Sequence, residues 1–226
     1  MPGRKAKSMV TIQKLAETDI PAVVEIHQDQ FPRARSTRLG RPFVHKMYCW
    51  FLEAQPELAL VARDGGQPVG FIVGAIGGYG RRIFRYAFPQ AVLGMLRHPG
   101  LVLQKNTFTM WKSYARAFAP NQSAASTQGM RAGNRASLSS IAVAQSAQRK
   151  GVARALMAEF EASARRLAVE RLDLSVGREN RPARHLYESC GWQPVEHLSA
   201  GGSVNYQKLL ETAPGRPSAN SYALHI

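Results

Sequence analysis

Two hydrophobic patterns alternate along this chain and divide it into elements. Strand patterns, either alternating or continuously apolar, occupy seven segments: 10–15, 58–62, 68–76, 138–143, 171–176, 192–197 and 203–210. Apolar residues three or four apart, typical of helices with one buried face, begin at Ile20 and recur in three later segments: 43–54, 152–167 and 183–190. The mixture of both types along one chain predicts an α/β domain.

Turn residues mark several connections. Asp64-Gly65-Gly66 separates the second and third strand segments and is a strong hairpin signal. Thr18 and Asp19 are typical of a helix start. The segment 31–41 is predicted to be a loop, and it carries four basic residues: Arg33, Arg35, Arg38 and Arg41. This loop either contacts an acidic group of a ligand or is a plain connection.

The segment from Leu138 to Ala153 has the order strand, basic turn, helix. Backbone N–H groups in the first turn of a helix have no internal acceptor, and the helix dipole adds positive charge there. Gly151 lets a bulky phosphate approach the backbone, and Arg149 and Lys150 add full charges. We therefore expect a phosphate or pyrophosphate at 148–153; an ordinary turn with basic surface residues is the alternative.

A second segment follows the strand 171–176, which Gly177 ends. Asn180 is suited to cap the next helix, and Pro182 is tolerated in its first turn. Tyr187 lies on the apolar face of that helix, which Gly191 is expected to terminate.

Together these two segments resemble a known family. Gln148-x-x-Gly151-x-Ala153 matches the acetyl-CoA signature of the GCN5-related N-acetyltransferases (GNAT superfamily). The run from Asn180 to Trp192 matches that family's second block, in which Phe usually replaces Trp192. The resemblance covers 138–210 closely, 10–76 loosely and the middle of the chain not at all. It implies the acyl-CoA N-acyltransferase fold: α/β, with a mixed, mostly antiparallel twisted sheet flanked by helices.

The resemblance also implies site residues. The end of the strand 138–143 is expected to splay from its neighbour, so that backbone N–H groups face the thioester carbonyl at Ile141, Ala142 and Val143. The pyrophosphate of acetyl-CoA is expected on the turn formed by Gln148, Arg149, Lys150, Gly151, Val152 and Ala153. Asn180 would hold the coenzyme arm, and Tyr187 would give a proton to the leaving thiolate. A plain helix cap and a core aromatic are the alternative roles.

The base that takes a proton from the attacking amine is not evident. Many relatives have a Glu on the strand where this chain has Ser139 and Ser140. Deprotonation then goes through water held by the backbone and Ser139, or through a side chain of the first half: Glu25, His27 or His45. An acceptor that arrives partly neutral is a further alternative. None of the six histidines has the spacing of a metal site.

The 226 residues are interpreted as one domain, 10–210, between a disordered basic tail at 1–9 and a loose tail at 211–226. A helical insertion at about 77–136 separates its halves. The insertion is predicted to hold two amphipathic helices and then a flexible linker: 81–97, 101–118 and 120–135.

Positive charge is concentrated in the middle of the chain. The net charge is +15, and no acidic residue occurs between Asp64 and Glu159. A basic face attracts polyanions such as coenzyme A, nucleotide-linked substrates or anionic lipid, although it can also be plain solvated surface. The helices of 81–118 therefore pack on the host domain, contact a membrane peripherally, cover the acceptor or form a homodimer contact. Nucleic acid is disfavoured because the basic residues are interleaved with bulky apolar ones.

The cysteines and the absence of targeting patterns bear on the cellular location of the protein. Cys49 and Cys190 lie in apolar helical patterns and are expected to be reduced core residues. No apolar segment follows the basic N-terminus, and no run is long and uncharged enough to span a membrane. The expected location is the cytoplasm, and peripheral attachment to the inner face of the membrane is the alternative.

These observations predict an acetyl-CoA-dependent N-acetyltransferase in which a primary amine attacks the thioester directly. The basic insertion favours a small acceptor that is anionic or linked to a lipid or nucleotide. Transfer of a longer acyl chain, and acyl-CoA binding without catalysis, are the alternatives. The acceptor, the acyl chain length and the general base are left open.

Overall fold

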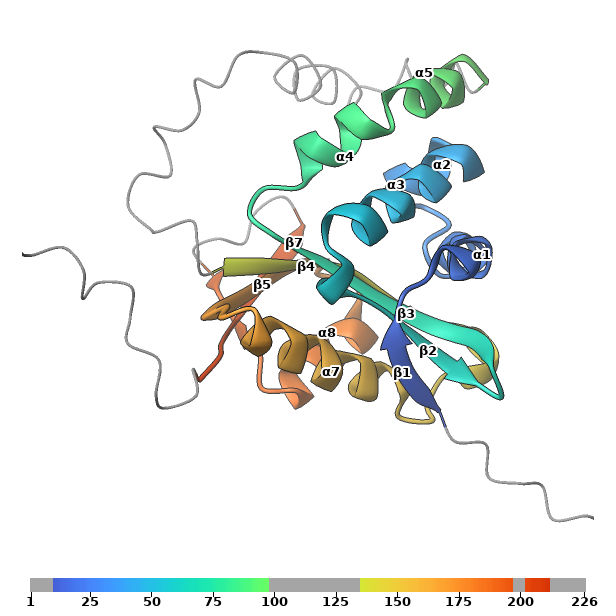
Figure 1. The fold of residues 1–226 in the computed structure, drawn as a ribbon. Helices are drawn as coiled ribbons and strands as arrows, with labels where there is room; N and C mark the ends of the chain where they lie inside the picture. Colours follow the sequence, from blue (N-terminus) through green and yellow to red (C-terminus); the bar gives the residue numbers. More distant parts are fainter. Residues whose placement is uncertain (1–9, 98–134, 197–201, 212–226) are drawn as a thin grey trace, which may run out of the picture.

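A computed structural model describes residues 10–97, 135–196 and 202–211. Its strands form a sheet in the order β1-β2-β3-β4-β5-β7-β6, which lies between two helical layers (Figure 1). The strands are β1 Thr11–Lys14, β2 Ala59–Asp64, β3 Gln67–Ile76, β4 Arg135–Val143, β5 Arg171–Gly177, β6 Gln193–Pro194 and β7 Ser203–Leu209. The helices are α1 Ile20–Gln30, α2 Arg35–Arg38, α3 Arg41–Ala54, α4 Gly80–Tyr86, α5 Phe88–Arg97, α7 Val152–Arg166 and α8 Arg181–Ser189. The predicted α/β fold, with a mostly antiparallel sheet flanked by helices, is confirmed.

Each face of the sheet buries its own hydrophobic core, because successive strand residues point to opposite faces. In β3, Phe71 and Val73 pack in the core of α1, α3, α4 and α5, whereas Ile72 between them packs in the core of α7. All three side chains are fully buried. A residue of the central strands therefore belongs to one helical layer or the other, and this decides its contacts near the site.

The strand β4 is where the sheet changes direction. It pairs with β3 antiparallel along its length, but with β5 parallel and only from Arg135↔Arg171 to Ser137↔Asp173. Beyond Ser137 no register pairs join β4 to β5, so the two strands diverge. The splaying expected of the strand 138–143 is thus present.

A β-bulge interrupts β4 at the start of this divergence. Leu138 lies opposite Gly74 and Ser140 opposite Val73, which leaves Ser139 without a partner on β3. A bulge adds local twist and redirects the residues that follow it. Ser139, predicted as a site residue, is therefore the residue at which β4 turns away from regular pairing.

The described part of the insertion forms two helices, not the single helix predicted over 81–97. α4 ends at Tyr86 and α5 begins at Phe88. Pro89 has no N–H to donate to the carbonyl of Arg85, so one continuous helix cannot pass this point.

α5 packs directly on the turn between α2 and α3. A Cβ built on Gly94 would lie 2.1 Å from the carbonyl oxygen of Leu39, a contact that only glycine permits. The buried side chains Ile83, Phe84 and Met95 join the core of α1 and α3. The described part of the insertion therefore rests on the host domain.

Some boundaries differ from the sequence prediction. The loop predicted over 31–41 contains the short helix α2. In the described part of the strand predicted over 192–197, only Gln193–Pro194 is a strand. β4 begins at Arg135, so the insertion ends before this residue. Four predicted segments lie outside the described residues: 1–9, 101–118, the linker up to 134, and the tail from 212.

The predicted hairpin between β2 and β3 is confirmed. Gly65 and Gly66 both have positive φ, 57° and 84°, as a two-residue turn between antiparallel strands requires. In the described ranges, every helix is too short or too polar to cross a lipid bilayer.

Candidate active site

The turn between β4 and α7 has a backbone suited to an anion. Arg149 and Gly151 both adopt positive φ, 60° and 82°, and Gly151 is the residue that precedes the helix. Nothing lies within 4 Å of the position that a Cβ of Gly151 would occupy. The first-turn N–H groups of α7 add donors, and its dipole adds positive charge. The open space over Gly151 and these donors fit a phosphate group.

The exposed side chain of Gln148 attaches this turn to neighbouring elements. Its Nε2 donates to the carbonyl oxygen of Val143 at 3.1 Å and to Oε1 of Gln30 at 2.8 Å. The first bond closes the turn against the end of β4, and the second attaches it to the end of α1. The side chain of Gln148 therefore positions the turn. Its predicted contact with a ligand would be made by its backbone N–H.

Asp173 of β5 is hydrogen-bonded to β4 at the point where the two strands separate. Ser137 Oγ donates to its Oδ1, and Arg135 Nε donates to its Oδ2. Ser137 and Asp173 form the last register pair between the two strands. Side-chain bonds thus hold the strands together at one end of the gap, while the other end is free to widen.

The far end of β4 presents an unpaired edge to the gap. Ile141, Ala142 and Val143 pair on one side with β3. In an antiparallel ladder, alternate residues point their N–H and C=O groups away from the partner strand. Because β5 has diverged, an extended ligand could bond to these groups as an added strand would. This placement agrees with the predicted role of 141–143.

Asn180 caps α8 as predicted. Its Oδ1 accepts the N–H of Ala183 at 3.2 Å. Pro182 occupies the first turn of the helix. Asn180 lies just after β5, the strand that bounds the gap, at the start of α8. Its contact with a coenzyme arm stays a prediction.

Tyr187 is a buried phenol with only 6% of its surface exposed. Its ring packs against Trp192 and Tyr206, with centroids 6.2 and 5.9 Å away. Burial, and then the neighbouring Tyr206, raise the pKa of Tyr187 to about 12. The phenol is therefore fully protonated at neutral pH, which is the form that a proton donor needs. The acid role of Tyr187 stays a prediction.

Trp192 stands where the family resemblance expects Phe, and its indole N–H has a partner. Nε1 donates to Glu161 Oε1 at 3.0 Å, and Lys208 Nζ donates to Glu161 Oε2 at 2.7 Å. Lys208 also donates to the carbonyl oxygen of Cys190 at 2.6 Å. These buried bonds join α7, the end of α8 and β7, and they support the helix that carries Tyr187.

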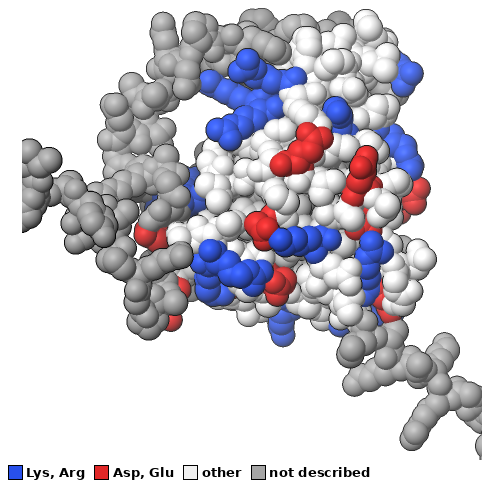
Figure 2. All heavy atoms as spheres, in the orientation of Figure 1, with Lys and Arg blue, Asp and Glu red and all other residues white. Residues whose placement is uncertain are grey.

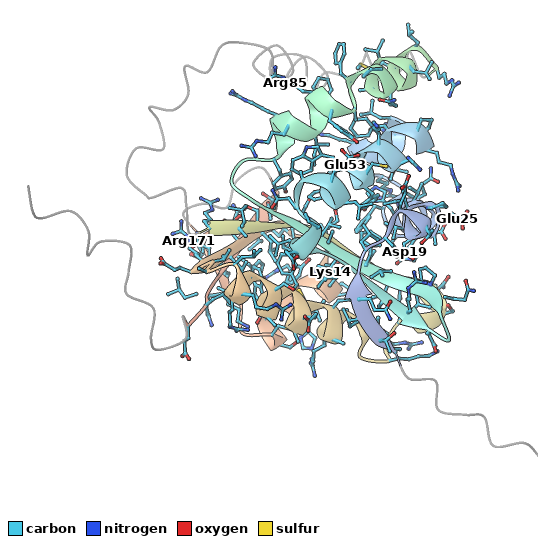
Figure 3. All side chains as sticks on the ribbon, in the orientation of Figure 1. Lys14, Asp19, Glu25, Glu53, Arg85 and Arg171 are labelled. Atoms are coloured by element: carbon cyan, nitrogen blue, oxygen red, sulfur yellow. The ribbon has the colours of Figure 1, made fainter. Side chains whose placement is uncertain are left out.

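The structure separates the three candidate bases. Glu25 is exposed at the outer edge of α1 and accepts a bond from Arg41 at 3.0 Å (Figure 3). His45 is exposed on α3, with Nδ1 3.5 Å from Cys49 Sγ. His27 is only 2% exposed and lies inside the layer that covers β4. Of the three, only His27 is buried, and both of its ring nitrogens have hydrogen-bond partners.

The imidazole of His27 is held between α3 and α2. His27 Nδ1 lies 2.7 Å from Tyr48 Oη, and its Nε2 lies 2.9 Å from Ser36 Oγ. Burial raises the pKa of Tyr48 well above its usual value, and the hydroxyl of Ser140, beside the bulge, lowers it by less. Sequence reasoning missed Tyr48, because it lies on the apolar stripe of α3 like any core aromatic. The one available signal is that a buried tyrosine hydroxyl usually has a polar partner.

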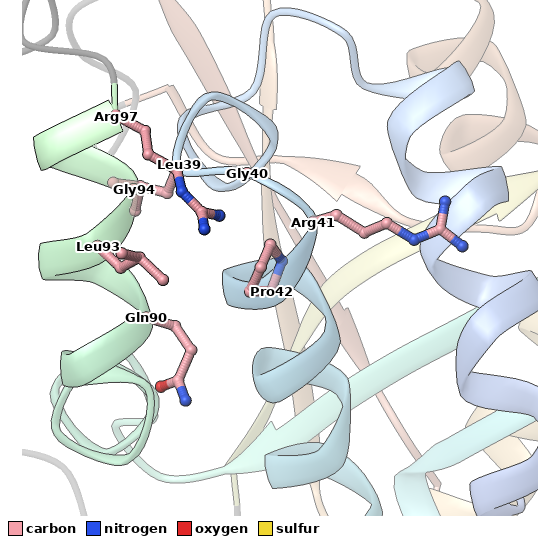
Figure 4. Close-up of a pocket in the computed structure, with 8 residues that line it drawn as sticks. All are labelled: Leu39, Gly40, Arg41, Pro42, Gln90, Leu93, Gly94 and Arg97. Atoms are coloured by element: carbon pink, nitrogen blue, oxygen red, sulfur yellow. The ribbon is translucent and has the colours of Figure 1, made fainter.

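A pocket of about 260 Å³ lies elsewhere, between α5 and the start of α3 (Figure 4). Arg97 extends along it, whereas Arg41 points away toward α1. It is lined by Leu39, Gly40, Arg41, Pro42, Gln90, Leu93, Gly94 and Arg97. The first three belong to the segment 31–41, for which contact with an acidic ligand group was one of two predictions. In the described ranges there is no group of three or more potential metal ligands.

Two parallel strands that diverge beside a turn suited to an anion, within a mostly antiparallel sheet, fit an extended, phosphate-bearing cosubstrate. A family model described as "Acetyltransferase (GNAT) family" matches residues 20–192. The chain therefore belongs to the GNAT acetyltransferase family and is an acyltransferase. A search of curated proteins found no match.

Solved structures share this fold. A ribosomal-protein-alanine N-acetyltransferase from Brucella melitensis is 19% identical, with a TM-score of 0.53, over 88% of this chain and 99% of that one. A phosphinothricin acetyltransferase from Sinorhizobium meliloti in complex with acetyl-CoA is 14% identical, with a TM-score of 0.58, over 95% and 96%. A putative acetyltransferase from Salmonella typhimurium with its cofactor acetyl-CoA is 14% identical, with a TM-score of 0.56, over 93% and 98%. At these identities the likeness is one of fold.

Proposed function

We propose that this acyltransferase moves the acetyl group of acetyl-CoA to a primary amine, which attacks the thioester directly. One observation carries the proposal: β4 leaves β5 just before a turn with two positive-φ residues and a helix start. The gap accommodates an extended coenzyme arm, and the turn accommodates its pyrophosphate. Two similarly folded acetyltransferases, from Sinorhizobium meliloti and Salmonella typhimurium, hold acetyl-CoA.

The proposed chemistry assigns one task to each part of the site. Backbone N–H groups at 141–143 stabilise the negative charge that develops on the thioester oxygen. Tyr187 gives its proton to the departing thiolate, and Asn180 orients the coenzyme arm at the start of α8. Ser139, at the bulge, holds a water near the reacting amine.

The finer proposal concerns the acceptor, which we take to be a small amine that is anionic or linked to a lipid or nucleotide. Three exposed arginines lie on α4: Arg81, Arg82 and Arg85. Basic side chains gather over this helix at one edge of the molecule (Figure 2). The described part of the insertion has no acidic residue to neutralise them. Uncompensated guanidinium groups favour an anionic partner.

A peripheral contact with the cytoplasmic face of a membrane is proposed for the same helices. On α5, Phe88, Val92 and Leu96 recur every four residues and are 38%, 37% and 73% exposed. Arginines on α4 beside an exposed apolar stripe on α5 suit a surface of anionic lipid.

Vesicle flotation tests the membrane contact. The protein should float with phosphatidylserine vesicles and not with phosphatidylcholine vesicles. Replacing Arg81 and Arg82 by Gln should abolish flotation. The matched control replaces the exposed pair Arg165 and Arg166 of α7, which removes the same charge from the other layer. Equal flotation of both variants would refute the contact.

Turnover with defined acceptors tests the transferase. Acetyl-CoA is mixed with benzylamine, spermidine, glucosamine 6-phosphate, an amino-sugar nucleotide and a short peptide, and both thiol release and acetylated product are measured. Transfer to at least one of these amines is expected, best to an anionic one. Faster reaction with a long-chain thioester would favour the longer-chain alternative. Binding of acetyl-CoA without transfer to any of these amines would favour a non-catalytic acyl-CoA-binding protein.

A further inference from the structure

Backbone and side chains together close one end of the gap between β4 and β5. The register pairs of the two strands end at Ser137↔Asp173. At this end Asp173 accepts a hydrogen bond from Ser137 Oγ at 2.5 Å and forms an ion pair with the guanidinium of Arg135. We call Asp173, Ser137 and Arg135 the Asp173 cluster. The side chain of Asp173 is only 15% exposed, so its carboxylate is largely shielded from water.

The direction of a bound coenzyme follows from the position of the anion turn. Gln148 attaches this turn to the carbonyl oxygen of Val143, at the open end of the gap. With its pyrophosphate on the turn, the coenzyme arm runs along β4 from Val143 toward the Asp173 cluster. The pantetheine arm has the length of about four residues of extended chain, ~13 Å, which brings its sulfur beside Ser139. The acyl group on that sulfur therefore points to the closed end of the gap.

One face of the sheet has no room for a long acyl chain at this end. Leu138 of β4, Leu174 of β5 and Phe160 of α7 are all buried in the core of α7. A Cβ built on Gly74, which lies opposite Leu138, would be 2.5 Å from the ring of Phe160. Because the side chains pack this closely, an acyl chain that turned to this face would have to displace the core.

The opposite face carries the Asp173 cluster. Because successive strand residues alternate, Ser137 and Asp173 point away from the α7 core that holds their neighbours Leu138 and Leu174. An acyl chain that turned to this face would cover the carboxylate and the guanidinium, which would lose water without gaining a partner. Straight ahead, ~7 Å beyond Ser139, the two strands are already joined. Only a few carbon atoms therefore fit between the thioester and the closed end.

We propose that the Asp173 cluster sets the acyl-chain limit of this acyltransferase and restricts it to short acyl groups such as acetyl. Asp173 is then a specificity-determining residue, which acts through its charge and its bonds to β4. Its role depends on the register of β5 against β4, which the sequence does not reveal. The inference rests on the proposed coenzyme site, because that site fixes the direction of the acyl group. It disfavours the transfer of a longer acyl chain.

Binding titrations test this limit without a known amine acceptor. Acetyl-, butyryl-, hexanoyl- and octanoyl-CoA are titrated calorimetrically into the wild-type protein, with CoA as the reference. A chain that entered an open apolar site would gain roughly fourfold in affinity for each added CH₂ group. We expect no such gain. Butyryl-CoA should bind like acetyl-CoA, and octanoyl-CoA should bind about 10-fold more weakly than acetyl-CoA.

Variants separate the cluster from the rest of the sheet. Asp173→Leu replaces the charge by an apolar side chain and should raise the affinity for octanoyl-CoA relative to acetyl-CoA about 10-fold. Asp173→Asn keeps a polar group of the same shape and should keep the wild-type order. Glu159→Leu is the matched control, because it removes the acid of an ion pair with Arg166 on α7. Ser137→Ala loses only one bond of the cluster and should give a smaller shift in the direction of Asp173→Leu.

Thermal unfolding is followed for every variant, and two results would overturn the limit while leaving the coenzyme site intact. One is a wild-type affinity that stays equal or rises with chain length, a result that needs no variant. The other is a folded Asp173→Leu protein whose ratio of octanoyl-CoA to acetyl-CoA affinity equals that of Glu159→Leu. Failure of CoA and all four esters to bind the wild type would instead overturn the coenzyme site, and the limit with it.

Discussion

The two helical layers serve β4 in different ways. On the side of α7 and α8, the candidate ligand contacts are backbone groups: the turn that ends at Gly151 and the unpaired edge at 141–143. On the side of α1 to α3, the polar contacts are hydrogen bonds between side chains that three elements bring together around His27. The first layer is organised by local conformation and the second by packing. The comparison teaches that the candidate binding turn and the buried hydrogen bonds of His27 can be altered separately in this molecule.

The largest stability effect is expected in the α7 layer, at Glu161. This carboxylate is 6% exposed and accepts bonds from both Trp192 and Lys208. Glu161→Ala leaves the buried indole N–H without its partner and the partly buried ammonium with only the carbonyl of Cys190, so unfolding free energy should fall by about 3 kcal/mol. Glu159→Ala on the same helix, which breaks an exposed pair with Arg166, should change it by less than about 1 kcal/mol. Denaturant titration compares the two variants. Equal losses of unfolding free energy would show that the hydrogen bonds of Glu161 to Trp192 and Lys208 do not stabilise the fold.

The next effect belongs to the α1–α3 layer and depends on pH. Since the pKa of His27 falls from 6.5 to about 4 on folding, the unfolded chain binds an extra proton between these pH values. The contribution of His27 to the free energy of unfolding should therefore be fully present above pH 6.5. It should decline by about 3 kcal/mol as the pH falls to 4. His27→Gln should flatten this part of the curve, whereas the exposed His45→Gln should not. Parallel curves for wild type and His27→Gln would contradict a buried, neutral imidazole.

A catalytic test separates the layers again. Tyr187→Phe should lower kcat about 100-fold by removing the proton donor to the thiolate, with acetyl-CoA affinity unchanged. The neighbouring Tyr206→Phe is the control, because its hydroxyl bonds to Glu188 and Arg184 instead. Steady-state rates together with binding titration decide the matter. If Tyr206→Phe loses as much rate as Tyr187→Phe, the aromatic cluster is structural.

The smallest effect concerns how the insertion joins the α1–α3 layer. Gly94→Ala places a methyl group against the carbonyl of Leu39, so α5 must shift, at an expected loss of about 1–3 kcal/mol. Gly80→Ala on α4 meets nothing within 4 Å and should be neutral or slightly stabilising. Thermal unfolding measures both variants. No difference between them would mean that α5 is not firmly docked.

The sequence predicted the α7 side well for a physical reason. A turn such as 148–153 is specified by adjacent residues, and Gly151 and Asn180 have conformational preferences that are visible without tertiary information. The hydrogen bonds of His27 join it to Tyr48 and Ser36, and each of the three alone looks like a buried histidine, a core aromatic or a surface serine. Only the packing of α1 on α2 and α3 brings them together.

The insertion shows a second limit of the sequence. The pattern over 81–97 correctly predicted amphipathic helix. It predicted one helix where the structure has two, because the apolar residues keep helical spacing on both sides of Pro89. The bulge at Ser139 was also not predicted. It depends on register against β3, which no local pattern encodes.

The most direct test of the central claim is calorimetric titration of acetyl-CoA into wild type, Gly151→Glu and Gly66→Glu. Both glycines have nearly equal φ, 82° and 84°, and both have open space around the missing Cβ. The two variants therefore carry similar backbone strain, but only Gly151→Glu places a carboxylate on the anion turn. We predict micromolar binding to wild type and to Gly66→Glu, and a loss of about 100-fold or more in Gly151→Glu. Equal affinity in all three proteins, or no binding to wild type, would contradict the coenzyme site assigned to this turn.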